Sequence, residues 1–133
     1  MSAPLLAFDR LAELLHVMSV GGCTTWRACN NADTTSRGPW PPGVYLPQRL
    51  IPVTGVDGAP QGSYGGYFLR YDVPGRVGMG IHAGRDGDAD GAGRIGPGHA
   101  TLGCIRTSDE AMAEIARKIE AAGGELPTLW VAR

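Results

Sequence analysis

The chain has 133 residues, which fits one domain, and its apolar fraction of 43% is enough for one hydrophobic core. The formal net charge is −1 and the Lys and Arg residues are scattered, so nucleic acid is not expected as a partner. No stretch is long and apolar enough to span a bilayer, so no transmembrane segment is expected. The 21 Gly and 10 Pro residues are typical of short strands joined by tight turns, and we expect a single domain over residues 1–133.

The first segment with an apolar pattern, residues 5–20, fits two kinds of structure. Leu11 and Met18 belong to a set at helical spacing, whereas residues 14–18 would equally form a buried strand. The pattern alone leaves both interpretations open. The next segment, residues 24–29, is β-branched and aromatic and predicts a strand.

The middle of the chain contains short strands between loops. Residues 36–43 include three prolines and predict a loop, because Pro lacks an N–H donor and restricts the residue before it. Short strands are expected at residues 44–47, 67–71 and 78–82. Residues 83–100 are rich in glycine and carry few apolar side chains, and a loop of that length is usually functional or mobile.

The clearest helix covers about residues 107–122. Thr107 is expected to cap its N-terminus, with Glu110 completing a capping box, and Gly123 is expected to end it. Residues 126–131 predict a closing strand.

The odd number of cysteines leaves at least one thiol unpaired. Cys23 and Cys29 would either pair across a turn or pack as apolar residues, and packing is the preferred interpretation. Cys104 lies just before the predicted helix, where the N–H groups of a helix N-terminus would lower the pKa of a thiol. Gly103 would let a substrate carbonyl approach the backbone, so that nearby N–H groups form an oxyanion hole.

A cysteine nucleophile needs a base within reach, and the chain has three histidines. His82 ends an apolar strand, His99 lies in the glycine-rich loop, and His16 is interpreted as an ordinary core or surface residue. Spacing alone makes a Cys–His pair one interpretation among several.

The segment from His82 through residues 101–106 resembles the signature of L,D-transpeptidase catalytic domains. That signature is a His, a loop, then Ser or Thr, His, Gly, Cys, an apolar residue, and Arg or Asn. Residues 38–45 resemble the Gly-Pro-x-Pro-x-Gly-x-Tyr turn of the same family, and the resemblance covers roughly residues 22–120. The sequence looks closest to the compact forms of interbacterial toxin effectors and phage proteins.

The resemblance implies a mainly β fold, an L,D-transpeptidase-like β-sandwich with one main helix beside the active site, which favours strands over residues 5–20. It also implies that Cys104 is the nucleophile, that His82 is its base, and that the backbone carbonyl of Ala83 orients the imidazole. Arg106 would steady the site or meet a substrate carboxylate. The family's second His is replaced by Leu102, and His99 is a candidate for the vacant role.

Further candidates surround this motif. Four residues are expected to contact substrate beside Arg106: Thr101, His99, Trp40 and Tyr64. Three carboxylates, Asp86, Asp88 and Asp90, have the spacing of a calcium loop, but the twelfth position is Pro97 rather than Glu, so a solvated acidic turn is favoured. No metal or organic cofactor is expected.

The expected activity is that of an L,D-transpeptidase or L,D-carboxypeptidase acting on peptidoglycan stem peptides through a Cys104 thioester, resolved by an amine or by water. The alternatives are a catalytically degenerate wall-binding or phage structural module of the same fold, and an unrelated cysteine peptidase. Residues 1–6 lack the basic region of a secretory signal, so no such signal is expected there. We therefore expect synthesis in the cytoplasm and action in the periplasm or cell wall after delivery by a secretion system or phage lysis. An immunity protein or a secretion apparatus are the further partners expected.

Overall fold

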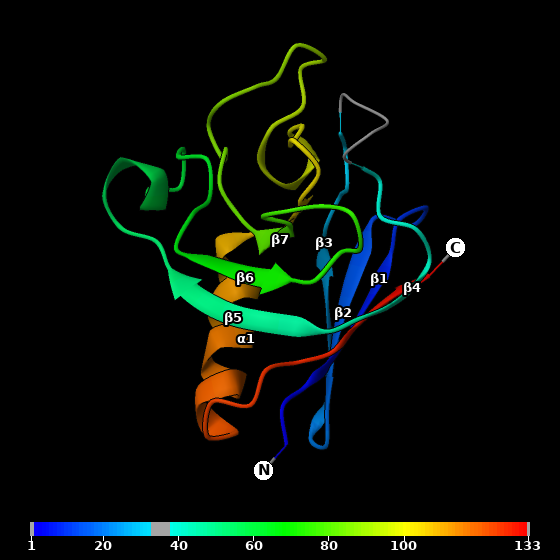
Figure 1. The fold of residues 1–133 in the computed structure, drawn as a ribbon. Coiled ribbons are helices and arrows are strands. Elements are labelled where there is room, and N and C mark those ends of the chain that lie inside the picture. Colours follow the sequence, from blue (N-terminus) through cyan, green and yellow to red (C-terminus); the bar gives the residue numbers. More distant parts are fainter. Residues whose placement is uncertain (1, 33–37, 133) are drawn as a thin grey trace.

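The computed structural model describes residues 2–32 and 38–132, which form two mixed β-sheets and, within these residues, a single α-helix (Figure 1). The first sheet has the order β3-β2-β1-β9-β4, in which β1 and β9 are parallel. Its strands are β1 (Leu5–Asp9), β2 (Leu14–Ser19), β3 (Gly22–Arg27), β4 (Gly43–Tyr45) and β9 (Leu129–Ala132). The mainly β class expected from the sequence is confirmed.

The second sheet has the order β5-β6-β7-β8, and its last pair, β7 and β8, is parallel. Its strands are β5 (Pro47–Pro52), β6 (Tyr67–Tyr71), β7 (Gly80–His82) and β8 (Ile105–Arg106), and two 3-10 turns, Gly55–Gly58 and Gly96–Gly98, lie in its loops. The single strand expected at residues 44–47 is instead two strands in different sheets. The chain changes sheet at Leu46, which is exposed.

Residues 5–20 are strands, as the family resemblance favoured. Leu6 and Phe8 in β1 and Leu15 and Val17 in β2 are fully buried, and the residues between them are not. This alternation is the period of a sheet with one covered face, so the helical spacing of the same segment has no structural role.

The helix α1 (Asp109–Ala121) begins two residues later than predicted, and its N-cap is Ser108 rather than Thr107. The Ser108 hydroxyl accepts a hydrogen bond from the Ala111 N–H at 3.1 Å. The Thr107 hydroxyl instead donates to the Arg27 carbonyl at 2.8 Å. The capping box with Glu110 was therefore a wrong prediction, because a distant strand takes up the Thr107 side chain.

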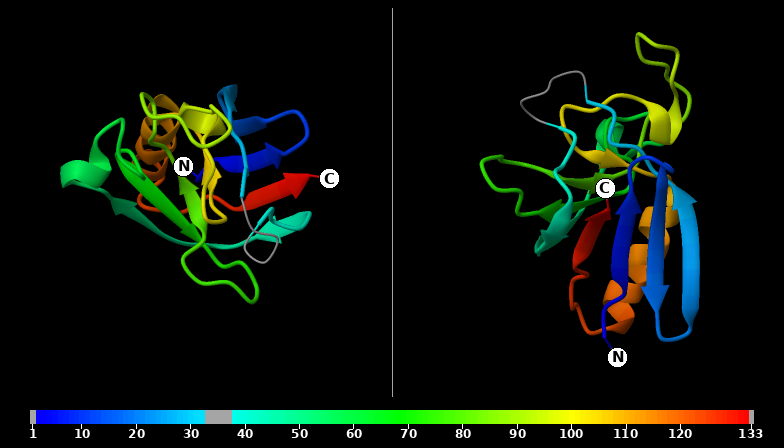
Figure 2. Two further views of the ribbon diagram at one scale, coloured as in Figure 1. Left: turned by 90° about the horizontal axis from the view of Figure 1, so that it is seen from above. Right: turned by 90° about the vertical axis from the view of Figure 1, so that its right-hand side faces the viewer.

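The hydrophobic core lies between the first sheet, the second sheet and α1, which packs against β6 (Figure 2). Buried side chains come from every layer, among them Phe8, Leu69, Ile81 and Met112. Burying a side chain of this size stabilises the fold by about 1.5–3 kcal/mol. Because Leu69 and Ile81 point into the core, the alternate residues of β6 and β7 point away from it, toward the candidate site.

Candidate active site

A cavity of about 1010 Å³ lies on the outward face of the second sheet, and Cys104, His82, His99 and Arg106 are among its lining residues. Sheet pairing explains this convergence. Phe68 is paired with Ile51 on one side and with His82 on the other, and His82 is paired with Arg106. Residues directly opposite each other share a face of a sheet. The structure thus brings the nucleophile and base expected from the sequence to one cavity.

His82 is buried and held by contacts on several sides. Its Nδ1 lies 2.8 Å from the Ala83 carbonyl oxygen, which can only accept, so Nδ1 carries the proton and Nε2 is left as an acceptor. The ring stacks on Phe68 at 5.7 Å and meets the edge of Tyr64 at 5.0 Å between ring centroids. Burial lowers the pKa of His82 to about 3, with the Ala83 bond opposing and Arg106 adding to this shift. The imidazole is therefore neutral near pH 7.

Cys104 is buried, with 8% of the residue exposed, and it lies at the carboxyl side of its turn, not at a helix end. Its Sγ is 3.7 Å from the Gly78 carbonyl oxygen, and the Gly80 N–H is hydrogen-bonded to the same sulfur. Burial raises the pKa of Cys104, while the Gly80 N–H and Arg106 lower it. The prediction that a helix N-terminus lowers this pKa was wrong, because β8, Thr107 and Ser108 separate Cys104 from α1.

The turn before Cys104 is stabilised by hydrogen bonds among its own residues, 101–104. Gly103 has a φ of 138°, which favours glycine, and its N–H donates to the Thr101 hydroxyl at 3.1 Å. That hydroxyl donates in turn to the Cys104 carbonyl at 2.6 Å. The expected substrate contact through Thr101 and the expected oxyanion donor at Gly103 are thus both used within the turn. The Cys104 N–H has no hydrogen-bond partner among residues 2–32 and 38–132.

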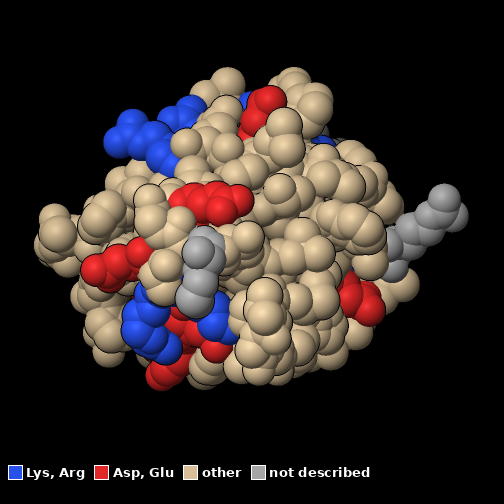
Figure 3. Space-filling model, turned by 90° about the horizontal axis from the view of Figure 1, so that it is seen from below, with Lys and Arg blue, Asp and Glu red and all other residues tan. Residues whose placement is uncertain are grey.

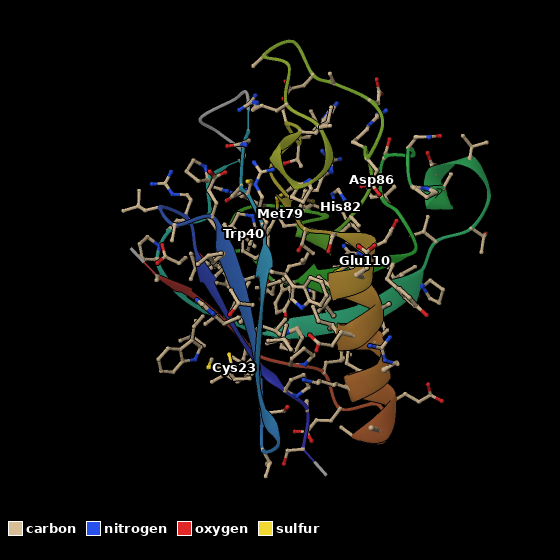
Figure 4. All side chains as sticks on the ribbon, turned by 180° about the vertical axis from the view of Figure 1, so that it is seen from behind. Cys23, Trp40, Met79, His82, Asp86 and Glu110 are labelled. Carbon is tan, nitrogen blue, oxygen red and sulfur yellow. The ribbon has the colours of Figure 1, made fainter. Side chains whose placement is uncertain are left out.

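Trp40 is 2% exposed, so the prediction that it contacts substrate was wrong. Its indole N–H donates to the Gly103 carbonyl at 2.7 Å, and its ring packs against Tyr45 and Tyr71. Figure 4 shows Trp40 inside the molecule, among the strands. The Pro-rich turn that contains Trp40 therefore holds the backbone next to Cys104 in place, and Trp40 does not line the cavity.

Sequence reasoning missed Asn30, which is buried and donates to the carbonyls of both Gly103 and Cys104 at 2.9 and 3.1 Å. Its side-chain oxygen accepts a hydrogen bond from the backbone N–H of Trp40 at 2.7 Å. One amide side chain therefore joins the Pro-rich turn to the turn that carries Cys104. The only signal was an asparagine at the end of a predicted strand, which is too common to identify a supporting residue.

Arg106 is buried, and its guanidinium donates hydrogen bonds to backbone carbonyls. It donates to Ala83 at 3.2 Å, to His99 and Ala100 at 2.9 Å, and to Ser63 at 2.9 Å. Burial and the nearby Arg85 lower its pKa to about 10, so it stays charged at neutral pH. The prediction of a substrate carboxylate contact does not fit these bonds. The alternative, that Arg106 steadies the site, does.

His99 and Tyr64 remain on the cavity wall, where the sequence placed them. His99 Nδ1 lies 2.9 Å from the Ala100 carbonyl oxygen and 3.2 Å from the Arg106 guanidinium. Tyr64 is 38% exposed and packs against both Phe68 and His82. Leu102, which stands where the family has a second histidine, is exposed beside the cavity.

The carboxylates of Asp88 and Asp90 in the glycine-rich loop bind different partners and do not form one site. Asp90 accepts from the N–H groups of Ala92, Arg94 and Ala100, and from the Arg94 side chain. Burial alone would raise its pKa, but these donors hold the pKa of Asp90 well below its usual range. Asp88 pairs with Arg85 at 2.8 Å. Within the described part of the chain, no three metal-binding side chains converge, and the calcium interpretation has no structural support.

The remaining cysteines do not form a disulfide. Cys23 is exposed on β3, so the preferred packing interpretation was wrong for it, and Figure 4 shows it on the first sheet, far from His82. Cys29 is buried, as that interpretation predicted, and its thiol lies 2.5 Å from a Glu13 carboxylate oxygen. Burial, then Glu13, raises the pKa of Cys29 to about 12. Neither thiol lines the cavity.

Comparison with known proteins identifies the fold. No family model and no curated protein matches the sequence. Among solved structures, the chain is similar to Bd1075 of Bdellovibrio bacteriovorus, with 16% identity and a TM-score of 0.69. It is also similar to L,D-transpeptidase 1 of Mycobacterium tuberculosis, with 19% identity and a TM-score of 0.52. A third match is the catalytic domain of the Enterococcus faecium L,D-transpeptidase, solved acylated by ertapenem, with 20% identity and a TM-score of 0.51.

The extent of these matches differs between the solved proteins. The chain is covered over 98–99% in each case, but it spans only 48% of Bd1075 and 62% of the mycobacterial protein. It spans 98% of the Enterococcus catalytic domain. The chain therefore has the fold of L,D-transpeptidase catalytic domains, a β-sandwich with its helix beside the site, as the sequence motifs predicted. None of the described residues forms a helix that could cross a membrane.

Proposed function

We propose that this protein is an L,D-transpeptidase or L,D-carboxypeptidase that acts on the stem peptides of peptidoglycan. The observation that carries the proposal is the placement of Cys104 and His82 on one cavity, with the proton of His82 held at Nδ1 by Ala83. The fold and the catalytic domains that share it support the same chemistry. A second imidazole, that of His99, lines the same cavity, but its Nδ1 lies 3.2 Å from the Arg106 guanidinium.

In the first step, His82 Nε2 accepts the proton of the Cys104 thiol as Sγ attacks the carbonyl carbon of the L,D-peptide bond. The oxyanion that forms is held by the Cys104 N–H, and one such donor is worth about 3 kcal/mol of barrier. The imidazolium then returns its proton to the leaving amine, the C–N bond breaks, and a thioester remains. An acceptor amine or water resolves this thioester, and the proton it loses passes through His82.

The electrostatics of the resting site fit a proton transfer that accompanies attack. Burial raises the pKa of Cys104 and lowers that of His82, so thiol and imidazole are both neutral before substrate binds. An ion pair forms only as the sulfur attacks, when the Gly80 N–H and the Arg106 charge stabilise the thiolate. The buried site thus has the base in its active, unprotonated form at neutral pH.

The test is mass spectrometry of muropeptides after incubation with the protein. Cys104→Ala and His82→Ala should each lower cleavage or exchange of the terminal D-residue by more than about 10³-fold. His16→Ala is the matched control, because His16 lies on β2, bonded to the Thr25 hydroxyl at 2.8 Å and away from the cavity. Wild-type turnover by Cys104→Ala would refute the mechanism.

The second candidate, a non-catalytic wall-binding module, is favoured by one observation, the exposed Leu102 in place of a histidine. A carbapenem probe separates the two. Stoichiometric acylation of Cys104 supports the enzyme, while wall binding without acylation supports the module. The route by which the protein reaches its substrate, through a secretion system or phage lysis, stays a prediction.

A further inference from the structure

Two arginines stand side by side on the face of the second sheet that carries the candidate site. Arg49 of β5 is directly opposite Arg70 of β6, and Arg70 is directly opposite Gly80 of β7. Arg70 is two residues from Phe68, which stacks on His82, so both face the same side of the sheet. The Gly80 N–H is hydrogen-bonded to Cys104 Sγ. The row that starts at Arg49 therefore ends at the proposed nucleophile.

The two guanidiniums have no carboxylate partner in the part of the chain that the structure describes. Arg70 Nε is shielded from solvent and has no hydrogen-bond partner among these residues. Seen from below, the molecule shows a cluster of Lys and Arg atoms that no Asp or Glu atom touches (Figure 3). Like charges directly opposite each other on a sheet are destabilising, so the pair costs the fold stability that a bound anion would restore.

We propose that Arg49 and Arg70 form a subsite for a carboxylate of the peptide that supplies the acyl group. Gly80 adds no side chain between Arg70 and Cys104, and a Cβ there would lie 2.4 Å from the Leu69 carbonyl oxygen and 2.8 Å from the Phe68 ring. The Phe68 ring, which lines the cavity, therefore lies over Gly80, and a bound peptide would pass along this ring. Strand spacing puts Arg70 about 10 Å from Cys104. Because an extended peptide advances about 3.3–3.6 Å per residue, the bound carboxylate lies within about three residues of the attacked bond.

This inference rests on the proposed function for the identity of the peptide. Its test compares two synthetic stem tetrapeptides that differ only in their side carboxylates, free in one and amidated in the other. The wild-type protein should prefer the free acid in kcat/KM by about tenfold, and Arg49→Gln/Arg70→Gln should reduce this preference to less than about twofold. Arg117→Gln, the same substitution at a single exposed position of α1, should keep the wild-type preference.

A binding measurement separates this inference from the proposed reaction. Calorimetry with Cys104→Ala should show tighter binding of the free acid than of the amide, and the two further arginine substitutions should abolish the difference. Equal preference in the wild-type and double-arginine proteins, in turnover or in binding, would overturn the subsite. Loss of binding to an anionic wall polymer, with peptide binding unchanged, would overturn it as well. Thermal unfolding of the double variant should be unchanged or raised, because a like-charge pair is removed.

Discussion

At the scale of single residues, the site depends on groups whose burial opposes their charged forms. His82 is almost fully buried between Phe68 and Tyr64, and Cys104 is nearly as inaccessible. One hydrogen bond, from Nδ1 to the Ala83 carbonyl, determines which ring nitrogen is available as a base. Burial therefore keeps the imidazole unprotonated, and the bond to Ala83 directs its free nitrogen.

The pKa of His82 predicts how stability depends on pH. Its folded pKa of about 3 lies below the ordinary value of 6.5, so the unfolded chain binds this proton more readily than the folded protein does. The free energy of unfolding should therefore fall as the pH drops from about 6.5 toward 3, by at most about 1.4 kcal/mol per pH unit. Urea unfolding of wild type and His82→Gln across this range measures it. The variant should show the shallower dependence, and parallel profiles would contradict the prediction.

At the scale of secondary-structure elements, the two-residue strand β8 positions both Arg106 and Cys104 in the candidate site. β8 contains only Ile105 and Arg106, yet its parallel pairing with β7 brings Arg106 opposite His82 and leaves Cys104 beside Gly80. The chain needs two more residues, Thr107 and Ser108, before α1 can start. This spacer separates the nucleophile from the helix dipole, so the neighbouring backbone and Arg106 supply the stabilisation of the thiolate.

The position of the helix cap gives a prediction about stability. Ser108→Ala removes the hydroxyl that accepts from the Ala111 N–H, and should lower the free energy of unfolding by about 0.5–2 kcal/mol. Ser108→Asp should restore it, since a carboxylate accepts the same bond. Glu110→Ala is the matched control for the capping box expected from the sequence, and should change stability by less than about 0.5 kcal/mol. A larger effect at Glu110 than at Ser108 would show that the cap was assigned wrongly.

At the scale of the whole molecule, Arg106 joins the loops that enclose the cavity. Its guanidinium bonds carbonyls of the segment before β6, the segment after β7 and the loop before β8, at Ser63, Ala83 and residues 99–100. The Ala83 carbonyl also accepts from His82, so the same arginine determines the shape of the cavity and the orientation of the base. The charge has no carboxylate partner in the described residues, which leaves its field for the thiolate.

Arg106→Lys tests this positioning role. Lysine keeps the charge but cannot reach four carbonyls with a planar fork, so buried acceptors lose their donors and stability should fall by about 1–3 kcal/mol. Turnover should fall at least about tenfold, with the loss in kcat rather than in KM, because the base and not substrate binding is disturbed. Arg117→Lys on the exposed face of α1 should change neither quantity. A rise in KM alone would instead support a substrate contact.

Much of the fold could be predicted from local patterns. The strand predicted at residues 67–71 is β6 with its correct bounds, and the helix predicted over about residues 107–122 is α1, which starts two residues later. Helix ends and sheet changes could not be predicted. Thr107 and Ser108 are equally good caps by chemistry, and only the distant Arg27 carbonyl decides between them. The break at Leu46 could not be predicted either, because β4 and β5 are almost continuous in sequence and only their pairing partners put them in different sheets.

The sequence alone determined which residues are candidates for chemistry, because a thiol, an imidazole and a flexible Gly turn are properties of the chain itself. The tertiary structure decided what their neighbours do. It buried Trp40, used the Thr101 hydroxyl inside the turn and surrounded Arg106 with carbonyls, since burial and hydrogen-bond partners come from segments far apart in the chain. It also aligned Arg49 and Arg70 in one row with Gly80, a consequence of strand register that no local pattern contains.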